Sequence, residues 1–130
     1  MERSSGPTAP DGLAPAAGGR AVAVSPADGR LLDEAVRRLV SALRPDRVYL
    51  YGSRARGDAH EDSDFDLMVV VPYAVTHSYV LEQQALAALW PLALPVDVVV
   101  MDSQRFEAQR PVAASLPATV VREGQLLYGG

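Results

Sequence analysis

The chain has 130 residues, of which 48% are hydrophobic and 22% are charged, which indicates one globular domain of ordinary composition. Its formal net charge of −4 argues against non-specific binding to DNA or RNA, which depends on a basic surface. The absence of cysteine excludes disulfides and thiolate metal sites, and no apolar run is long enough to span a bilayer. We therefore expect a cytoplasmic protein with no DNA or membrane partner.

The N-terminal part of the chain divides into a tail and a helix. Residues 1–24 are rich in Gly, Pro, Ala and Ser without a period, which predicts a flexible tail, and residues 25–130 are expected to form the domain. Ser25 and Pro26 are favoured residues for the N-cap and the first position of a helix. Apolar residues then recur at helical spacing, and the helix should end before Pro45.

Two short strands are predicted next, with a glycine turn and a polar loop between them. Val48–Tyr51 is aliphatic and aromatic and stops at Gly52, and Phe65–Val71 is a longer apolar run. The connecting segment 54–63 is polar apart from two alanines, so we expect it to lie in solvent above the turn.

A further helix and strand are predicted from capping residues and from an apolar run. Thr76 or Ser78 is a suitable cap for a helix that reaches about Trp90, and Trp90 itself is predicted to lie in the core. Val96–Val100 is nearly all apolar, which is typical of a strand in the centre of a sheet.

The C-terminal segment is predicted to hold two short helices and an edge strand. Asp102 or Ser103 can cap the first helix, and Ser115 can open the second, which should end at Gly124. Leu126–Tyr128 can then add an edge strand. Together the elements predict an α/β domain of the α+β type, in which helices pack on a small mixed sheet of three to four strands.

Two aspartates stand two residues apart at the start of the second predicted strand. Because side chains alternate along a strand, Asp64 and Asp66 should point one way while Phe65 and Leu67 point into the core. Carboxylates held this close repel each other unless a cation lies between them, and Mg²⁺ is a hard ion that prefers oxygen ligands. Asp97 can complete a cluster of three carboxylates if its strand lies beside this one. Otherwise it is a carboxylate in solvent at a strand end.

The Gly-Ser turn before the acidic pair offers a place for phosphate groups. Gly52 lets the backbone approach a ligand closely, and Ser53 offers a hydroxyl and an amide proton. Arg54 and Arg56 can add positive charge to a phosphate or can pair with acidic residues of the same loop. Acids on a plain surface strand need no ligand, but the adjacent turn favours a site for a metal-bound nucleoside triphosphate.

The order of these residues resembles a known family signature. Gly52-Ser53, ten intervening residues and then Asp64-Phe65-Asp66 is similar to the Gly-Ser, spacer, Asp-x-Asp motif of the DNA polymerase β-like nucleotidyltransferase superfamily. The form of the motif looks especially like the short prokaryotic branch, the minimal nucleotidyltransferases. The specific part of the resemblance is Tyr51–Leu67, and the ending Arg122–Tyr128 also resembles the close of this family's domain. The resemblance implies the polymerase β-like nucleotidyltransferase fold.

The resemblance also implies a reaction and a role for each acidic residue. The chain would move a nucleoside monophosphate, AMP from ATP, onto an acceptor hydroxyl with two Mg²⁺ ions as cofactors. Asp64 and Asp66 would hold the ions. Asp97 would ligate the metal next to the acceptor hydroxyl and help to deprotonate it.

The residues around the turn receive phosphate-binding roles from the same resemblance. Gly52 and Ser53 would hold the β- and γ-phosphates through backbone and hydroxyl groups. Arg54 and Arg56 would add positive charge to the leaving pyrophosphate. Catalysis of this kind depends mostly on positioning and electrostatics, so a small chain with few site residues suffices for it.

A partner protein is implied as well. In the minimal branch the acceptor is commonly a helical HEPN-type toxin, so this chain would be the antitoxin that adenylylates it, in a homo- or hetero-oligomer. Such a partner needs an exposed apolar patch, which we expect on the C-terminal helices.

Two alternatives of different classes remain beside this one. The chain could be a non-catalytic nucleotide- or partner-binding module that neutralises its partner by contact, although such a module has no need of three acids. It could also adenylylate a small antibiotic such as an aminoglycoside, although the chain has no room for the extra helical domain that binds such acceptors.

Overall fold

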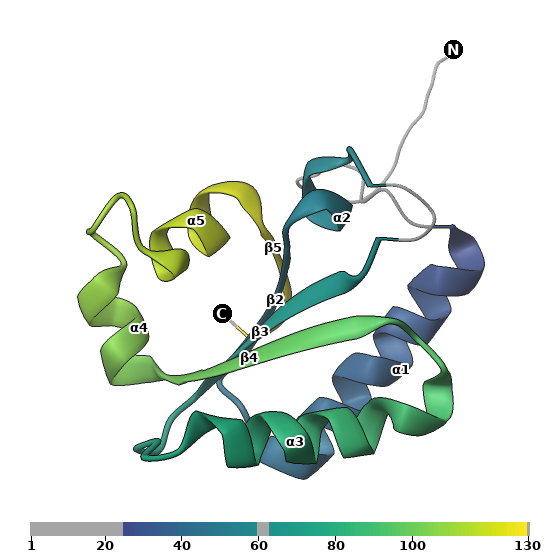
Figure 1. Cartoon of the computed structure of the whole chain (residues 1–130), viewed down its shortest axis with the longest axis horizontal. Coiled ribbons are helices and arrows are strands. Elements are labelled where there is room, and N and C mark those ends of the chain that lie inside the picture. Colours follow the sequence, from purple (N-terminus) through teal and green to yellow (C-terminus); the bar gives the residue numbers. More distant parts are fainter. Residues whose placement is uncertain (1–24, 60–62, 130) are drawn as a thin grey trace.

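The computed structural model describes residues 25–59 and 63–129, and Figure 1 shows how their helices and strands are arranged. The predicted tail, residues 1–24, lies outside the described residues, so its boundary with the domain stays a prediction. In the part of the chain that is described, no helix is both long and apolar enough to cross a membrane.

A four-stranded mixed sheet in the order β4-β3-β2-β5 forms the centre of the fold. Strand β2 pairs antiparallel with both β3 and β5, and β3 pairs parallel with β4. The predicted fold class, a small mixed sheet with packed helices, is confirmed. The strands are β2 Arg47–Tyr51, β3 Phe65–Val71, β4 Val96–Asp102 and β5 Gln125–Gly129.

The prediction that the third apolar run lies centrally in the sheet is wrong, because β4 is an edge strand. Its apolar side chains are covered by a helix instead of by strands on both sides. Helix α3, Ser78–Leu89, packs along β4, and Val98 and Val100 are buried there. A continuous apolar run therefore reports burial of the side chains and does not distinguish a neighbouring strand from a covering helix.

Helix α1 spans Pro26–Leu43 and begins and ends as predicted. The Ser25 side chain accepts a hydrogen bond from the Asp28 amide at 3.1 Å, which caps the first turn. At the other end Arg44 adopts a left-handed conformation with φ 51°, and its amide donates to the carbonyl oxygen of Val40. The helix buries one stripe against the sheet, formed by Leu32, Ala35, Leu39 and Leu43.

Helices cover the two faces of the sheet in pairs, as Figure 1 shows. Helices α1 and α3 pack on the face that carries Leu67 and Val69. Helices α4, Ser103–Gln109, and α5, Leu116–Glu123, lie on the other face, where Phe106 packs against Met68. Because side chains alternate along β3, the face under α4 and α5 is the one that also carries Asp66.

The end of α3 differs from the prediction. Trp90 is 83% exposed, so its predicted place in the core is wrong. Ala85 and Leu89 are the helix residues that face inward, and a rotation of about 100° per residue carries the next side chain away from the core. The helix continues into a single 3-10 turn, η2, Trp90–Leu92. At its other end, the N-cap of α3 is His77, which lies between Thr76 and Ser78, the two residues predicted to cap it.

The C-terminal segment follows the prediction closely. The Asp102 side chain caps α4 by accepting a hydrogen bond from the Arg105 amide at 2.8 Å, and the Ser115 hydroxyl caps α5 by accepting one from the Ala118 amide at 3.2 Å. Gly124 is the C-cap of α5, and β5 then pairs with β2 at the edge of the sheet.

Candidate functional site

The structure brings Asp66 and Asp97 together on adjacent strands. In the parallel pairing of β3 with β4 these two residues are direct register partners, so their side chains leave the sheet on the same face. Asp64 comes just before β3 and is exposed, as is Asp97, whereas Asp66 is half-buried. A carboxylate cluster requires that the strand of Asp97 lie beside the strand of Asp66, and this condition is met.

The two other acids act electrostatically on Asp66. The pKa of Asp66 is raised, first by burial and then by the negative charges of Asp97 and Asp64, while Arg56 opposes the shift. A carboxylate under these conditions gains from a nearby cation, because the cation offsets both the repulsion and the loss of hydration.

The carboxylate oxygens match the ligand preference of Mg²⁺, but the metal site itself stays a prediction. Within residues 25–59 and 63–129, no three His, Asp or Glu side chains are arranged so that they could hold a metal ion. Asp66 and Asp97 provide two adjacent donors, and Asp64 contributes charge at the N-terminal end of β3. The donor chemistry therefore fits a hard divalent cation whose remaining ligands come from a triphosphate and water.

The Gly-Ser turn lies directly against the carboxylate of Asp66. Gly52 has φ 77° and ψ −158°, a conformation that is nearly restricted to glycine. A Cβ atom at this position would overlap with the carboxylate of Asp66. Glycine is needed here both for the backbone conformation and because the backbone lies so close to Asp66. The turn and the pair Asp66 and Asp97 therefore form one site.

The loop after the turn is less exposed than predicted. Ser53–Arg56 forms a short helix, α2, and Arg54 and Ala55 are buried, so the prediction of a solvent-exposed loop is wrong for these two residues. Residues 60–62 of the predicted loop lie outside the described residues. The buried side chains attach the turn to the body of the sheet.

Arg54 has a structural role that its sequence context did not indicate. Its side chain is 7% exposed, and its guanidinium carbon lies 4.4 Å from the centre of the Phe65 ring. Its Nε and Nη2 atoms donate to the carbonyl oxygen of Ser63 at 3.2 and 2.9 Å. Ser63 immediately precedes Asp64, so Arg54 holds the backbone that presents this acid.

We expect Arg54→Lys to lower the free energy of unfolding by about 1.5 to 3 kcal/mol, because lysine cannot keep both the stacking and the forked hydrogen bond. The matched control is Arg56→Lys, which alters an exposed arginine and should change stability by less than about 0.5 kcal/mol. Urea denaturation of both variants measures the difference. Equal stability losses in the two variants would contradict the structural role of Arg54.

Arg56 lies at the surface between two acidic partners. Its Nε atom is 3.3 Å from Asp58 Oδ2, and its Nη1 atom is 3.7 Å from Glu123 Oε1 on α5. The side chain remains 45% exposed, and its positive charge acts to lower the pKa of Asp66. The contact of either arginine with a phosphate stays a prediction.

Tyr51, the last residue of the strand before the Gly-Ser turn, is a neighbour of the acidic residues. It is the register partner of Asp66 in the antiparallel pairing of β2 with β3, so Tyr51, Asp66 and Asp97 form a row across three strands. Burial, followed by the charges of Asp66, Asp97 and Glu82, raises the pKa of Tyr51 to about 12. The phenol therefore keeps its proton to a higher pH than an ordinary tyrosine does. The strand register places Tyr51 beside Asp66.

Comparisons with known proteins identify a domain family and a similar fold. A profile of the nucleotidyltransferase domain family matches residues 30–126, a range that includes the Gly-Ser turn and all three aspartates. A crystal structure described as a candidate nucleotidyltransferase from Sulfolobus solfataricus is 22% identical, with a TM-score of 0.52, and the match covers 77% of this chain and 78% of that chain. That likeness supports the fold.

Two further solved structures are similar to the chain. One, described as a candidate minimal nucleotidyltransferase, is 31% identical with a TM-score of 0.49, and the match covers 75% of this chain and 91% of that chain. The other is a toxin-antitoxin with AMP-PNP, 25% identical with a TM-score of 0.49, and the match covers 75% of this chain and 73% of that chain. A search of curated proteins found no match.

Proposed function

The chain belongs to the nucleotidyltransferase domain family, and from this premise we propose that it transfers AMP from ATP to a hydroxyl group of a partner protein. The observation that supports this proposal most directly is the adjacency of Asp66 and Asp97 under the Gly52 turn. Carboxylates attract the metal ion of a metal-bound triphosphate. Because Gly52 has no Cβ, its backbone can also lie close to the phosphates.

Each site residue has a role in the proposed reaction. Asp66 and Asp97 would hold Mg²⁺, with Asp64 adding negative charge beside them, and the ion when bound supplies positive charge to the triphosphate and to the acceptor oxygen. The acceptor oxygen forms a bond to the α-phosphorus as the bond between that phosphorus and the β-phosphate oxygen breaks. Asp97, exposed at the edge strand, would take the proton of the acceptor hydroxyl, and pyrophosphate leaves.

The turn and one arginine would bind the phosphates that leave. Gly52 and Ser53 would hold the β- and γ-phosphates through backbone amides and the serine hydroxyl. Of the two predicted arginines, the half-exposed Arg56 is the better candidate for contact with pyrophosphate. It is close enough to Asp66 for its positive charge to act on the pKa of that carboxylate. The buried Arg54 would contribute by holding the backbone next to Asp64.

The acceptor in this proposal is a helical toxin of the HEPN type, with the present chain as its antitoxin. It would approach the sheet face that carries Asp66, which α4 and α5 flank. Val112 and Val121 are 56% and 38% exposed in this C-terminal part, where we expected an apolar contact surface.

Labelled ATP distinguishes the proposed reaction from its alternatives. With Mg²⁺ and a co-purified helical partner, label at the α-phosphate of ATP should move to the partner, and label at the γ-phosphate should not. Transfer of the γ-label would contradict nucleotidyl transfer. Neutralisation of the partner without any transfer would favour the non-catalytic module.

Ligand binding gives a second measurement that does not depend on an acceptor. A non-hydrolysable ATP analogue with Mg²⁺, at a concentration of about 100 times its dissociation constant, should stabilise the protein by about 2.7 kcal/mol. The chelator EDTA should remove most of this effect, and Asp97→Asn should weaken it. Stabilisation by the analogue that is unchanged in EDTA would contradict the metal-dependent part of the proposal.

A further inference from the structure

The hydroxyl groups of Tyr49, Tyr51 and Tyr73 differ in what they contact. The Tyr49 hydroxyl accepts a hydrogen bond from Arg47 Nη1 at 3.2 Å, and the Tyr73 hydroxyl donates one to the carbonyl oxygen of Leu43 at 2.7 Å. In the part of the chain that the structure describes, the Tyr51 hydroxyl has no hydrogen-bond partner, although its side chain is half-buried. A half-buried hydroxyl of this kind is available to a ligand.

The Tyr51 phenol is directed along the sheet towards the acidic residues. Tyr51, Asp66 and Asp97 are successive register partners on β2, β3 and β4. The negative charge of Asp97 acts on the phenol, although two strand spacings, or roughly 10 Å, separate the two backbones. The charge of Glu82, which accepts a hydrogen bond from the Val100 amide of β4, acts on it as well. Because such effects weaken with distance, they indicate that the hydroxyl lies over β3, on the side of β4.

Packing supports the ring from the other side. Tyr51 lies against the apolar cluster under α4 and α5, which includes Phe106 and Val120. A Cβ atom on Gly124 would lie 3.3 Å from the Tyr51 Cβ, so the backbone there packs against the base of the side chain. Gly124 leads into β5, the neighbour of β2 opposite β3. The ring is therefore held towards the acids before any ligand binds, which lowers the entropic cost of binding.

The chemistry of the neighbouring groups makes this hydroxyl a hydrogen-bond donor. The next side chains in the row, Asp66 and Asp97, are carboxylates, which only accept hydrogen bonds when they are ionised. In the proposed reaction their oxygens are occupied by the metal ion, so phosphate oxygens are the strongest acceptors left near the phenol. Tyr51 also directly precedes Gly52 and Ser53, to which the same reaction assigns the β- and γ-phosphates.

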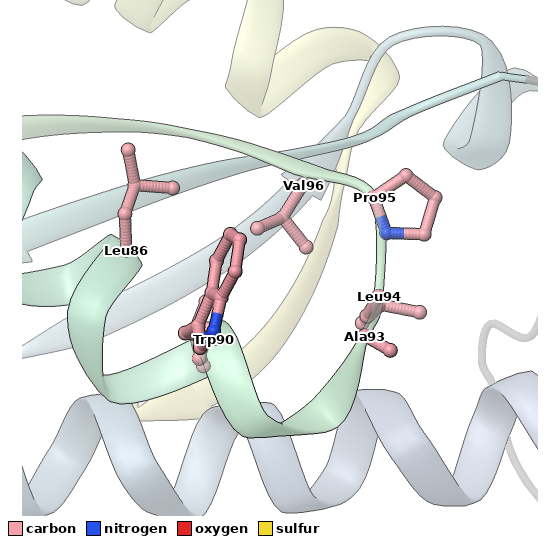
Figure 2. A pocket seen from close by; sticks show the side chains of 7 residues that line it. Leu86, Trp90, Ala93, Leu94, Pro95 and Val96 are labelled. Atoms are coloured by element: carbon pink, nitrogen blue, oxygen red, sulfur yellow. The ribbon is translucent and has the colours of Figure 1, made fainter.

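The apolar groove at the start of β4 offers no alternative place for phosphate. Leu86 and Trp90 line it from the helical side, and Pro95 and Val96 line it from the strand, as Figure 2 shows. Its lining contains no charged or hydroxyl-bearing side chain. Because side chains alternate along β4, Val96 and Asp97 also belong to opposite faces of the sheet. Phosphate groups are therefore expected on the face of the acidic row.

We propose that the Tyr51 hydroxyl donates a hydrogen bond to a non-bridging phosphate oxygen of the bound nucleoside triphosphate. The inference rests on the proposed function, because it needs the triphosphate to lie between the Gly52 turn and the acidic residues. A neutral donor binds phosphate without a positive charge of its own. It therefore does not compete with the metal ion for the carboxylates of Asp66 and Asp97.

Tyr51→Phe removes the hydroxyl and keeps the ring. When a non-hydrolysable ATP analogue with Mg²⁺ is titrated into the full chain in a calorimeter, the dissociation constant should be about tenfold or more above that of the wild type, as is usual for a lost hydrogen bond to a charged acceptor. Inorganic triphosphate with Mg²⁺ should lose affinity by the same factor, because the bond is to phosphate. The urea midpoint of the ligand-free variant should equal that of the wild type, since the hydroxyl has no protein partner to lose.

Tyr49→Phe is the matched control. It removes the same group from the same face of β2, two residues earlier. That hydroxyl is bonded to Arg47, and the Tyr49 ring stacks on Phe106 with centroids 5.6 Å apart. The control should bind both phosphate ligands with wild-type affinity within about twofold and should unfold at a lower urea concentration. One substitution should thus affect binding alone, and the other stability alone.

Two results would overturn the role of Tyr51. The first is Mg²⁺-dependent binding of both phosphate ligands that Tyr51→Phe leaves unchanged, and the proposed function would then stand without this bond. The second is a loss of affinity for the ATP analogue but not for inorganic triphosphate, which would assign the hydroxyl to the ribose or the base. A wild-type chain that binds neither ligand with Mg²⁺ would contradict the proposed function itself, so the two failures can be told apart.

Discussion

Replacing Asp66 with asparagine is expected to slow nucleotidyl transfer by about a thousandfold or more. Asp66 is the central member of the acidic group, because it is the register partner of Asp97 and lies in contact with the Gly52 turn. An amide keeps the shape of the side chain but removes the charge that would hold the metal-bound triphosphate in position. Transfer of the α-label to the partner protein, measured at saturating ATP, gives the rate.

The same substitution should not weaken the fold. Burial and the charges of Asp97 and Asp64 raise the pKa of Asp66, so its ionised form destabilises the folded protein. Stability of the metal-free protein is then lost as pH rises through this raised pKa. Asp66→Asn lacks the charge, and at neutral pH without metal it should be at least as stable as the wild type in urea. A variant that is inactive because it is unfolded would contradict this prediction.

Asp33→Asn is the matched control for the loss of charge. Asp33 is exposed on α1, which packs on the face of the sheet away from Asp66. The change in net charge is the same, but the site is untouched, so transfer should continue at the wild-type rate within about twofold. A large loss of activity in this control would show that net charge, and not the acidic group, determines the rate.

Replacing Gly52 with alanine is expected to reduce both stability and transfer. The φ of 77° and ψ of −158° lie in a region where residues with a Cβ are strained, at a cost of about 1 to 3 kcal/mol. The new methyl group would also overlap with the Asp66 carboxylate and displace it. We expect at least a hundredfold loss of transfer, because a small displacement of a positioned catalytic group has effects of this size. Urea denaturation and the α-label assay measure the two effects.

Gly57→Ala separates backbone strain from the steric conflict. Gly57 has φ 89°, so alanine is strained there as well, but a Cβ would meet nothing within 4 Å. This variant should lose about 1 to 2 kcal/mol of stability and keep most of its transfer activity. If Gly52→Ala and Gly57→Ala lose transfer equally, the close approach of the turn to Asp66 is not what the reaction requires.

Local signals predicted the boundaries of most elements correctly. Ser25 and Ser115 were each expected to begin a helix, as was either Asp102 or Ser103. The side chains of Ser25, Asp102 and Ser115 each accept a hydrogen bond from a backbone amide three residues ahead. Such caps depend only on residues within one turn, so the sequence carries the complete information. The strand Phe65–Val71 was likewise predicted with the bounds that the structure has.

The errors occurred where burial depends on distant elements. Trp90 was assigned to the core, yet its side chain lies outside because the preceding residue, Leu89, already fills the inward position. Arg54 was assigned to solvent because it is charged, yet Phe65 and the Ser63 carbonyl oxygen provide a buried place for it. Residue type alone predicts neither outcome, because each depends on the surface that the rest of the chain presents.

In the candidate site, too, some features follow from the local sequence and others depend on distant parts of the chain. The amino-acid sequence by itself determined that glycine stands at the turn, that two aspartates start the next strand, and which family carries this motif. Only the tertiary structure decided that Asp97 lies beside Asp66 and that Tyr51 completes their row. The physical reason is that residues within a few positions interact whatever the rest of the chain does, whereas strand order and register depend on packing of the whole sheet against its helices.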